Sequence, residues 1–531
     1  MSRYLSGVVV LRSTMSRTKL ETLRRFAAVA GAVGAALILG WGAAGALAAS
    51  SIGAYTTKGA WSFVSAPSLH PPKLATDAPT VTGKLADGDF LLANFPNIGA
   101  SGPMTGEGGP LIVDQRLQPV WFEPVGIDVL SADLQQESYL GQPVLVWWQG
   151  VVTRTGGTTS GEVVIVDQHY RRLATLTAKA PWVISLHDVV ISGADIWVTV
   201  YRDVRDQNLA AYGGPHKGTV YDAGVQEYDL ATGRLLYTWD ALNPGRTPNV
   251  SLAESEQPAY GLSATGGVWD AYHLNSVQVL PGNEILVSMR NTWAAYLIDT
   301  MTGKIVWELG GKHSSFSFAR GAAFQWQHDV QLLAGGEVSL FDDGCCKRLR
   351  SGSFTRPNGS SQGMLLRLDL AKRRVSLTAA YPHRPTFNTA LLGSMQVLPD
   401  GNALVGWGAV PYFTEYARSG RRLLDVVFPR KDQSYRALFT STWVGTPYYP
   451  PSGAVRKARG RTTIYASWNG ATQVAGWEVL GGASVHDLAV VGKGRRTGFE
   501  TAIALKKGGY SVFEVRALDA RNNVLGTSKP F

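Results

Sequence analysis

A unit repeated six times along the chain constrains the fold more than any other feature of this sequence. Each unit ends in one hairpin pattern, an apolar strand, an aspartate, a short turn and a second apolar strand, as in "AYLIDTMTGKIVWELG". An aspartate side chain can hydrogen-bond the backbone of its own turn, which explains why it recurs. It stands at Asp114, Asp167, Asp229, Asp299 and Asp369, and Ala417 takes its place in the sixth unit.

A second hairpin, such as "SVQVLPGNEILVSMR", precedes each of these, so every unit supplies four strands. Four-stranded units that recur at intervals of roughly fifty to seventy residues are typical of a β-propeller. A pair of β-sandwiches is the alternative, but sandwiches do not need the same glycine and aspartate turn chemistry at six places. The sequence therefore predicts an all-β protein built around a six-bladed β-propeller.

The pattern changes after Pro450, where short alternating strands predict a small immunoglobulin-like or fibronectin-like β-sandwich. The chain is accordingly divided into a basic N-region with a signal peptide or transmembrane anchor (1–50), an N-terminal extension (51–87), the propeller (88–451), a linker (452–461) and the C-terminal sandwich (462–531).

The N-terminal segment predicts export from the cytoplasm. An uncharged run from Phe26 to Ala49 is long enough to form a membrane-spanning helix, and the charge that flanks it is positive on one side. The run ends in "ALAAS", which signal peptidase can cleave, so a secreted protein and a single-pass membrane protein both remain open. Either way, we expect everything after Ser50 to be extracytoplasmic. The basic residues before the run are Arg3, Arg12, Arg17, Lys19, Arg24 and Arg25.

Charge and cysteine content exclude some classes of partner and bond. The formal net charge is +10, but the basic residues are scattered or lie at the N-terminus, so no nucleic-acid partner is expected. Cys345 and Cys346 are the two cysteines of the chain. Being adjacent, they can form a vicinal disulfide or stay reduced, but they cannot join distant segments.

Aligning the repeated hairpins brings imidazoles into register. His187, Asn275, His328 and Gly393 share one position, and fifteen residues later the same register gives Arg202, Arg290, Asp343 and Gly408. His273 lies two residues before Asn275 and is expected on the same face of an extended strand. Equivalent positions on the first strands of propeller blades form a ring, so these side chains should converge at one mouth of the channel. Arg202, with acidic neighbours, is expected to be an ion-paired loop residue.

Such a ring favours an oxyanion over a metal ion. Three imidazoles suit zinc or copper, but an arginine among them opposes a cation. A guanidinium beside neutral imidazoles suits sulfate, phosphate or carboxylate. Imidazole can also act as a covalent nucleophile or a general acid. No glycine-rich phosphate loop stands between a strand and a helix, so the residues indicate transfer of an oxyanion group without a nucleotide donor or other cofactor.

The segments "HLNSVQVLPGNEILVSMRN", "WQHDVQLLAGGEVSLFDDG" and "LHDVV" resemble the bacterial arylsulfate sulfotransferase family. The likeness extends from about Gly88 to Pro450, and "YASWNGATQVAGWEV" resembles the C-terminal sandwich of its actinobacterial and fungal subgroup. The resemblance implies a six-bladed propeller that moves sulfuryl groups from a phenolic sulfate ester to another phenol without a cofactor or a metal.

The resemblance also implies roles for individual residues. The family's transiently sulfated histidine falls on His328, its "HxN" pair on His273 and Asn275, its sulfate-binding arginine on Arg290, and a further active-site histidine on His187. His328 would attack sulfur, Arg290 and Asn275 would hold the sulfuryl oxygens, and His187 or His273 would move the phenol proton. This scheme has ping-pong kinetics and a sulfohistidine intermediate. Five tryptophans are candidates for an aromatic wall: Trp147, Trp148, Trp269, Trp293 and Trp326.

Two departures from the family affect what can be carried over. The enterobacterial enzymes have an N-terminal β domain and a spaced disulfide near the active site, and this sequence has neither pattern. They leave acceptor specificity and oligomeric state open. The competing classes are a non-catalytic extracytoplasmic propeller that binds an anionic or aromatic ligand, and a quinone-dependent dehydrogenase, for which no metal and quinone constellation is found.

Overall fold

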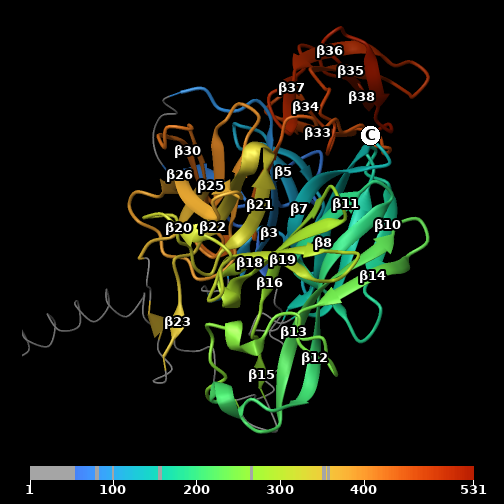
Figure 1. The fold of residues 1–531 in the computed structure, drawn as a ribbon. Coiled ribbons are helices and arrows are strands. Elements are labelled where there is room, and N and C mark those ends of the chain that lie inside the picture. The colour runs from blue at the N-terminus through green and yellow to red at the C-terminus, as the bar shows by residue number, and fades with distance from the viewer. Residues whose placement is uncertain are drawn as a thin grey trace, which may run out of the picture. The chain divides into compact units, whose positions relative to one another are not determined.

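The computed structural model describes residues 54–77, 83–97, 101–152, 158–262, 267–349, 354–355 and 359–531 (Figure 1). The predicted signal or anchor segment, residues 1–50, lies outside these ranges. Within them, no helix is both long and apolar enough to cross a membrane.

The described chain is all-β, as predicted. Its helical residues lie in short 3-10 turns, which are η2 (Ala210–Tyr212), η3 (Leu252–Glu254), η4 (Arg290–Thr292) and η5 (Ala334–Gly336). Everything else in the described ranges is strand, turn or loop.

Six sheets of four or five strands make up the described chain from Ala75 to Thr440. The first three in chain order are β32 (Ala437–Thr440) and β31 (Asp432–Gln433) with β3 (Asp89–Pro96), β5 (Gly109–Val113) and β6 (Pro119–Phe122); β7 (Leu130–Tyr139), β8 (Gln142–Val152), β9 (Thr158–Val166) and β10 (Arg172–Thr177); and β11 (Val183–Ser192), β12 (Asp195–Gln207), β13 (Gly218–Asp229), β14 (Arg234–Asp240) and β15 (Val268–Trp269).

The other three sheets follow the same order, and Figure 1 traces them through green, yellow and orange. They are β16 (Leu274–Leu280), β17 (Glu284–Met289), β18 (Ala294–Asp299) and β19 (Ile305–Gly310); β21 (His328–Leu333), β22 (Glu337–Asp342), β25 (Gln362–Asp369), β26 (Arg374–Pro382) and β20 (Ser317–Phe318); and β27 (Ser394–Val397), β28 (Ala403–Gly406), β29 (Tyr412–Tyr416), β30 (Arg422–Val427) and β2 (Ala75–Thr76). Two small pairs are β1 (Tyr55–Thr56) with β4 (Met104–Thr105) and β23 (Lys347–Arg348) with β24 (Phe354–Thr355).

The first strands of the six sheets contact one another in a closed circuit. β7 contacts β11, β11 contacts β16, β16 contacts β21, β21 contacts β27, β27 contacts β32, and β32 contacts β7. The circuit closes because β32, late in the chain, pairs antiparallel with β3, which is early in it. We call these six strands the inner strands. Residues at equivalent positions on them must therefore lie around a common centre.

The repeated hairpin chemistry is confirmed. The Oδ1 atoms of the five recurring aspartates accept backbone N–H bonds of 2.8 or 2.9 Å from their own turns, at Asp114, Asp167, Asp229, Asp299 and Asp369. The side chain thus supplies the turn with an acceptor that the backbone lacks there.

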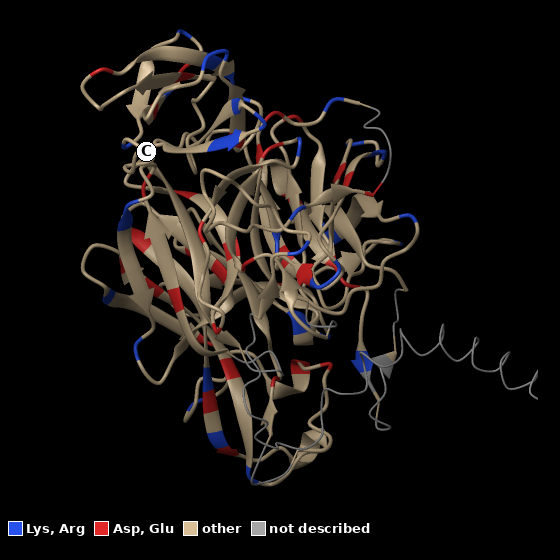
Figure 2. Cartoon of the chain, turned by 180° about the vertical axis from the view of Figure 1, so that it is seen from behind, with Lys and Arg blue, Asp and Glu red and all other residues tan. Residues whose placement is uncertain are grey.

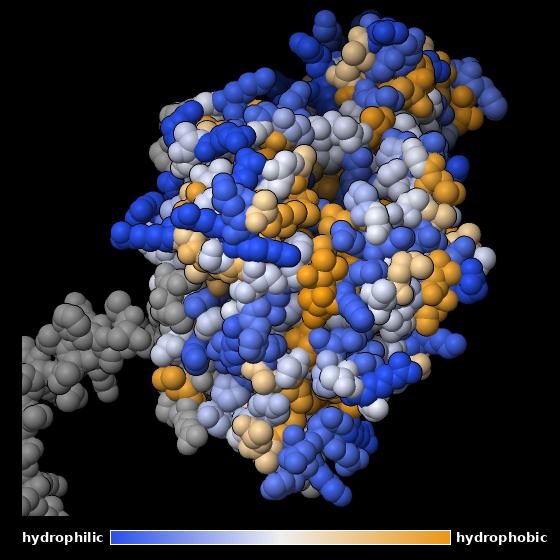
Figure 3. Space-filling view, viewed as in Figure 1, coloured by the Kyte–Doolittle hydropathy of each residue, from blue (hydrophilic) through white to orange (hydrophobic). Residues whose placement is uncertain are grey.

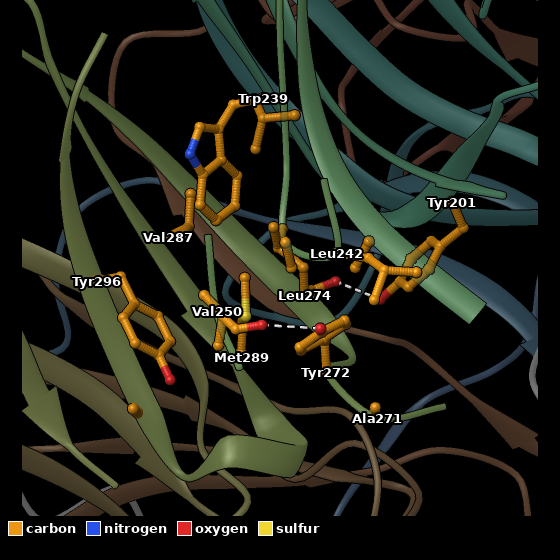
Figure 4. Close-up of a cluster of buried hydrophobic side chains, with 14 of the residues drawn as sticks. Tyr201, Trp239, Leu242, Val250, Ala271, Tyr272, Leu274, Val287, Met289 and Tyr296 are labelled. Atoms are coloured by element: carbon orange, nitrogen blue, oxygen red, sulfur yellow. Dashed lines mark hydrogen bonds between the residues drawn. The ribbon is translucent and has the colours of Figure 1, made fainter. Parts of the chain in front are cut away.

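Buried aromatic and aliphatic side chains fill the space between neighbouring sheets. Figure 4 shows part of the largest cluster, where Tyr201 from β12 donates to the carbonyl of Leu274 and Tyr272 donates to that of Val250. Outermost strands instead leave some hydrophobic side chains exposed, among them Leu173, Leu236 and Val306. Hydrophobic and hydrophilic residues alternate over the face in Figure 3, and Figure 2 shows basic and acidic residues interspersed on the opposite side.

The C-terminal residues form two further sheets around one core. The strands are β33 (Ser452–Ala458), β34 (Arg461–Ser467) and β37 (Glu500–Ala504) in one sheet, and β36 (Ala489–Arg495), β35 (Gly476–Gly482), β38 (Val512–Leu518) and β39 (Val524–Thr527) in the other. Ile464, Trp477 and Val515 from both sheets share one buried cluster. The predicted linker, residues 452–461, contains β33 and the first residue of β34. β33 is an edge strand of its sheet and is largely exposed.

Candidate active site

Hydrogen bonds between successive inner strands confirm the repeat register. In each case a side chain that follows a ring position accepts a bond from the backbone N–H of the next inner strand. The four bonds are Val277 to Asp188 (2.9 Å), Val330 to Ser276 (3.2 Å), Met395 to Asp329 (3.1 Å) and Ala437 to Ser394 (3.1 Å). The last of them extends the register to Tyr435, which therefore shares the position of His187, Asn275 and His328.

The inner strands are irregular at this position. The pairing register shifts between Ile184 and Val189 in β11, between Leu274 and Ser276 in β16, and between His328 and Gln331 in β21. Bulges of this kind turn side chains away from the regular alternation of a strand. The ring residues are thus displayed at local breaks of the sheets.

His187, His273 and Tyr435 form one contact cluster. The ring centroids of His187 and His273 lie 4.8 Å apart, and the Tyr435 ring lies 5.6 Å from His187 and 6.4 Å from His328. The Nδ1 atom of His187 is hydrogen-bonded to the hydroxyl of Ser185. The residue two positions before β32 therefore contributes an aromatic ring close to two of the three histidines.

His328 is fully buried and paired with a carboxylate. Its Nδ1 lies 2.6 Å from Oδ2 of Asp343, and neither side chain is exposed to solvent. A carboxylate oxygen accepts, so Nδ1 carries the proton and Nε2 keeps its lone pair. Consistently, Nε2 accepts the backbone N–H of Leu392 at 3.3 Å. This tautomer places the nucleophilic lone pair on Nε2.

His273 forms a second and more open pair. Its Nδ1 is hydrogen-bonded to Oδ2 of Asp270, and the side chains are 12% and 20% exposed. His273 has a left-handed backbone, with a φ of 57°, and precedes β16, so the expectation that it lies on an extended strand is wrong. The bonds of Tyr272 and Tyr201 in Figure 4 hold the backbone on both sides of it. Solvent thus reaches this histidine but not His328.

Arg290 lies at the start of η4. Its side chain is 8% exposed and stacks on Trp326, with 4.4 Å between Cζ and the ring centroid. Within the described ranges, its side chain makes one hydrogen bond, from Nε to Asn291 Oδ1 at 3.0 Å, and no ion pair. Both terminal nitrogens therefore lack a protein partner there. Burial lowers the pKa of Arg290, and the nearby carboxylates of Asp270 and Asp343 partly offset this lowering.

Asn275 joins the ring to the strand of His328. Its Nδ2 donates to the carbonyl of Gln327 at 2.7 Å, and its buried Oδ1 has no hydrogen-bond partner among the described residues. Its own carbonyl accepts the hydroxyl of Tyr435 at 3.3 Å. One N–H of the amide thus remains for another acceptor.

The environment of all three imidazoles lowers their pKa and so favours the neutral form. Burial lowers the pKa of His187 and of His328 well below the ordinary value, and Arg290 and His273 lower both further. Burial and Arg290 also lower the pKa of His273, while Asp270 opposes them. Burial alone would raise the pKa of Asp270, but His273 and Arg290 outweigh it and the pKa is lowered. Neutral imidazoles beside one guanidinium suit an anionic ligand.

The five candidate tryptophans divide into two groups. Trp147, Trp148 and Trp269 belong to hydrophobic cores between sheets. Trp326 forms a separate buried cluster with Cys345 and Cys346, against which Trp293 packs, and we call these four residues the aryl wall. The two cysteines, for which the sequence left a disulfide or two thiols open, are paired with each other.

The structure brings the five predicted site residues together and adds others. Arg202 lies elsewhere, in β12, where it is ion-paired with Asp222 at 3.0 Å and Asp240 at 3.2 Å. That it is ion-paired is confirmed, although it lies in a strand and not in a loop. Sequence reasoning missed the roles of Asp343, Asp270 and Tyr435. Asp343 shares the register position of Arg290, which was a usable signal.

No group of three or more histidine, cysteine, aspartate or glutamate side chains in the described ranges is placed to hold a metal ion.

Comparisons with known proteins identify a family. The family model described as Arylsulfotransferase (ASST) matches residues 136–429, more than half of the 531-residue chain. A search of the curated proteins found no match. Similar solved structures include a protein of unknown function from Bacteroides caccae (10% identity, TM-score 0.37, covering 66% of this chain and 99% of that one). Another is the Cps50 (Swd1) β-propeller domain of Myceliophteria thermophila (11% identity, TM-score 0.33, covering 74% and 99%).

Proposed function

The chain belongs to the arylsulfotransferase (ASST) family, and from that premise we propose that it moves a sulfuryl group from a phenolic sulfate ester to another phenol through a sulfohistidine. The observation that carries the proposal is Arg290, a buried guanidinium whose two terminal nitrogens have no protein partner in the described ranges. A buried arginine without a partner is costly unless an anion binds it. A planar fork of donors fits two oxygens of a sulfuryl group.

The first half-reaction uses the buried pair. The Nε2 lone pair of His328 gives up its hydrogen bond from the Leu392 N–H and attacks sulfur. The bond between sulfur and the aryl oxygen breaks, and its electrons leave with the phenolate. Arg290 and the remaining N–H of Asn275 hold the sulfuryl oxygens, whose charge changes little in a loose transition state, so positioning dominates. Asp343 balances the positive charge that the ring of His328 acquires when Nε2 bonds to sulfur.

The second half-reaction returns a proton through the outer pair. We assign proton transfer to His273 and not to His187, because His273 has a carboxylate partner and is the more exposed. His273 is neutral, with its Nδ1–H facing Asp270, so its Nε2 first takes a proton from solvent and then gives it to the departing phenolate. The acceptor phenol gives it back as its oxygen takes the sulfuryl group from His328. General acid and base help of this kind contributes roughly a hundredfold to ten-thousandfold.

The aryl wall is the proposed surface for the phenol rings. The guanidinium of Arg290 already covers the Trp326 ring, so a phenol ring that contacts the more exposed Trp293 has its sulfate group near that guanidinium. The buried Nε1 of Trp293 has no hydrogen-bond partner among the described residues and can donate to an oxygen of the substrate. An aromatic face binds planar rings without demanding one substituent, which fits a phenol-to-phenol transferase.

The function is tested by incubating the protein with 4-nitrophenyl sulfate, with and without phenol. We expect nitrophenolate release that rises with phenol concentration, and phenyl sulfate as the second product. Release without any dependence on an acceptor would mean a sulfatase. No release with any phenol would favour the alternative, a propeller that binds an anionic or aromatic ligand without chemistry.

Arg290→Lys should lower kcat/KM on the order of 10²-fold to 10³-fold, because a point charge replaces a fork that holds two oxygens. The fold should be retained, since the side chain of Arg290 makes one short-range hydrogen bond. Arg202→Lys is the matched control, as that arginine is ion-paired away from the ring. Steady-state kinetics that show equal losses in both variants would remove Arg290 from the site.

For the fold, we propose a six-bladed β-propeller followed by an immunoglobulin-like sandwich. The closed circuit of six inner strands supports the propeller, and two sheets that share one core support the sandwich. The strand β32 would then close the ring of blades by completing the sheet of β3. A circuit without a free edge explains how six twisted sheets can share one centre.

For location, we propose that the residues after Ser50 lie outside the cytoplasm, with the protein held in the cell membrane by residues 26–49 or secreted after cleavage. Six basic residues before the apolar run support this orientation. Protease added to intact cells or spheroplasts should digest residues 88–451. The digested protein should be found with the cells if it is anchored, and in the medium if it is secreted. Full protection until the membrane is lysed would contradict the proposal.

A further inference from the structure

A buried arginine and three buried aspartates lie directly beside the ring. Arg436 follows Tyr435 and so shares the register position of Asp188 and Asp329, which follow His187 and His328. Its Nη1 lies 3.0 Å from Asp188 Oδ1, 3.2 Å from Asp133 Oδ1 and 3.6 Å from Asp329 Oδ1. One guanidinium is thus surrounded by carboxylates from the inner strands β7, β11 and β21.

Arg436 also binds the fourth of these strands. Its Nη2 donates to the carbonyl of Asn275 at 3.2 Å, and its guanidinium lies over the Tyr435 ring, 5.3 Å from the centroid. Asp188 and Asp329 in turn accept backbone bonds from Val277 and Met395. Every inner strand that carries a predicted ring residue is therefore connected to this one side chain.

We call Arg436 and its three aspartates the layer, and part of this layer borders a cavity. A volume of about 620 Å³ is bounded by Asp188, Asp329 and Arg436 and by polar side chains further along the inner strands, such as Gln331 and Gln396. Burial raises the pKa of Glu137 in this cavity to about 8, and Asp188 adds to the effect. Arg436 and two of its carboxylates thus border this cavity directly.

Charged groups reach the imidazoles from both sides. Arg290 and His273 act on His187 and His328 from the ring, Asp343 binds His328, and Arg436 acts on both from the layer. The hydroxyl of Tyr435 is bonded to a carbonyl and carries no charge. Removal of Arg436 would therefore take away a cation that both imidazoles experience.

We propose that Arg436 is a positioning residue of the ring: it holds the strands of His187, Asn275 and His328 together and places a cation against Asp188 and Asp329, the residues that follow two of the imidazoles. That Arg436 affects catalysis depends on the proposed function, but the test of its effect on the histidines does not. Neutral His328 is what a nucleophile requires, so a change at Arg436 should act through protonation.

The test compares Arg436→Gln with Arg436→Lys, and with Arg202→Gln as a matched control. Arg202 is also ion-paired with buried or half-buried carboxylates, but it lies outside the ring. The full chain is labelled with ¹³Cε1-histidine, whose nine histidines give nine signals, and titrated by NMR. In Arg436→Gln, the titration midpoints of His187 and His328 should rise by about one pH unit, since a nearby unit charge is removed.

Both other variants should leave these midpoints unchanged, because the lysine keeps the charge and Arg202 does not face the ring. Unchanged midpoints in Arg436→Gln, or equal shifts in Arg202→Gln, would overturn the proposal. If Arg436→Gln does not fold, the double variant with Asp133→Asn removes one uncompensated carboxylate, and the same rise is expected.

Activity gives a second readout. A higher imidazole pKa means that His328 becomes protonated at a higher pH, so the acid limb of kcat/KM should move upward in Arg436→Gln and stay in place in Arg202→Gln. The NMR titration needs no turnover. Shifted midpoints in a protein without transferase activity would therefore refute the proposed function and leave the role of Arg436 standing.

Discussion

Replacing His328 with asparagine should abolish both half-reactions, with a loss in kcat of at least about 10⁴-fold, because it removes the proposed nucleophile. The tautomer fixed by Asp343 leaves the lone pair on Nε2, so this nitrogen is the expected site of modification. Intact-protein mass spectrometry after brief exposure to donor without acceptor should show the gain of one SO3 in the wild type and none in His328→Asn.

The matched control is His383→Asn. His383 is equally buried and bonded to a carboxylate, with 2.9 Å between its Nε2 and Asp425 Oδ2, but it lies outside the ring. It should lose stability and keep its chemistry. A wild-type protein that turns over donor yet never gains SO3 at His328 would exclude the covalent route and favour direct transfer between the two phenols.

Asp343→Asn should lower kcat by on the order of 10²-fold to 10⁴-fold, as expected when the partner of a catalytic histidine can no longer select its tautomer. An asparagine amide can donate to Nδ1, which moves the ring proton onto Nε2 and removes the nucleophile. It also leaves the charge of the sulfated ring unbalanced. The loss should appear in both half-reactions, which single-turnover measurements of nitrophenolate release and of acceptor sulfation separate.

Asp425→Asn serves as the control for Asp343→Asn, because it removes a buried carboxylate from His383 in the same way. If Asp343→Asn and Asp425→Asn lose activity only in proportion to their melting temperatures, Asp343 supports the fold and not the reaction. If Asp343→Asn retains the sulfated state but forms it slowly, the tautomer argument holds.

The part of the site that could be predicted from the sequence is the part that lies within the repeated hairpins. Turn aspartates, strand alternation and register are local in sequence, so aligning the hairpins is enough to place His187, Asn275 and His328 at one position. Arg290 followed from the same register. The contacts that connect successive inner strands then confirm this alignment directly.

Partners that depend on geometry outside the repeat were not predictable. Asp270 precedes β16 and reaches His273 through a left-handed residue, which no alternation rule anticipates. Tyr435 and Arg436 precede β32, whose partner β3 lies at the other end of the repeats, so no hairpin pattern marks them. Asp343 follows β22 and reaches His328 beside the register shift between β21 and β22, a local irregularity that the alignment does not show.

The late position of β32 in the chain also determines when the site can be completed during synthesis and folding. Tyr435 and Arg436 are synthesised after every other residue of the ring, and they take their places only when the late segment finds β3. Pairing between segments so distant in sequence is slow, because much chain must be ordered before the contact forms. A nascent or truncated chain that ends before this segment therefore holds all three histidines without Tyr435 and Arg436, the residues that connect their strands.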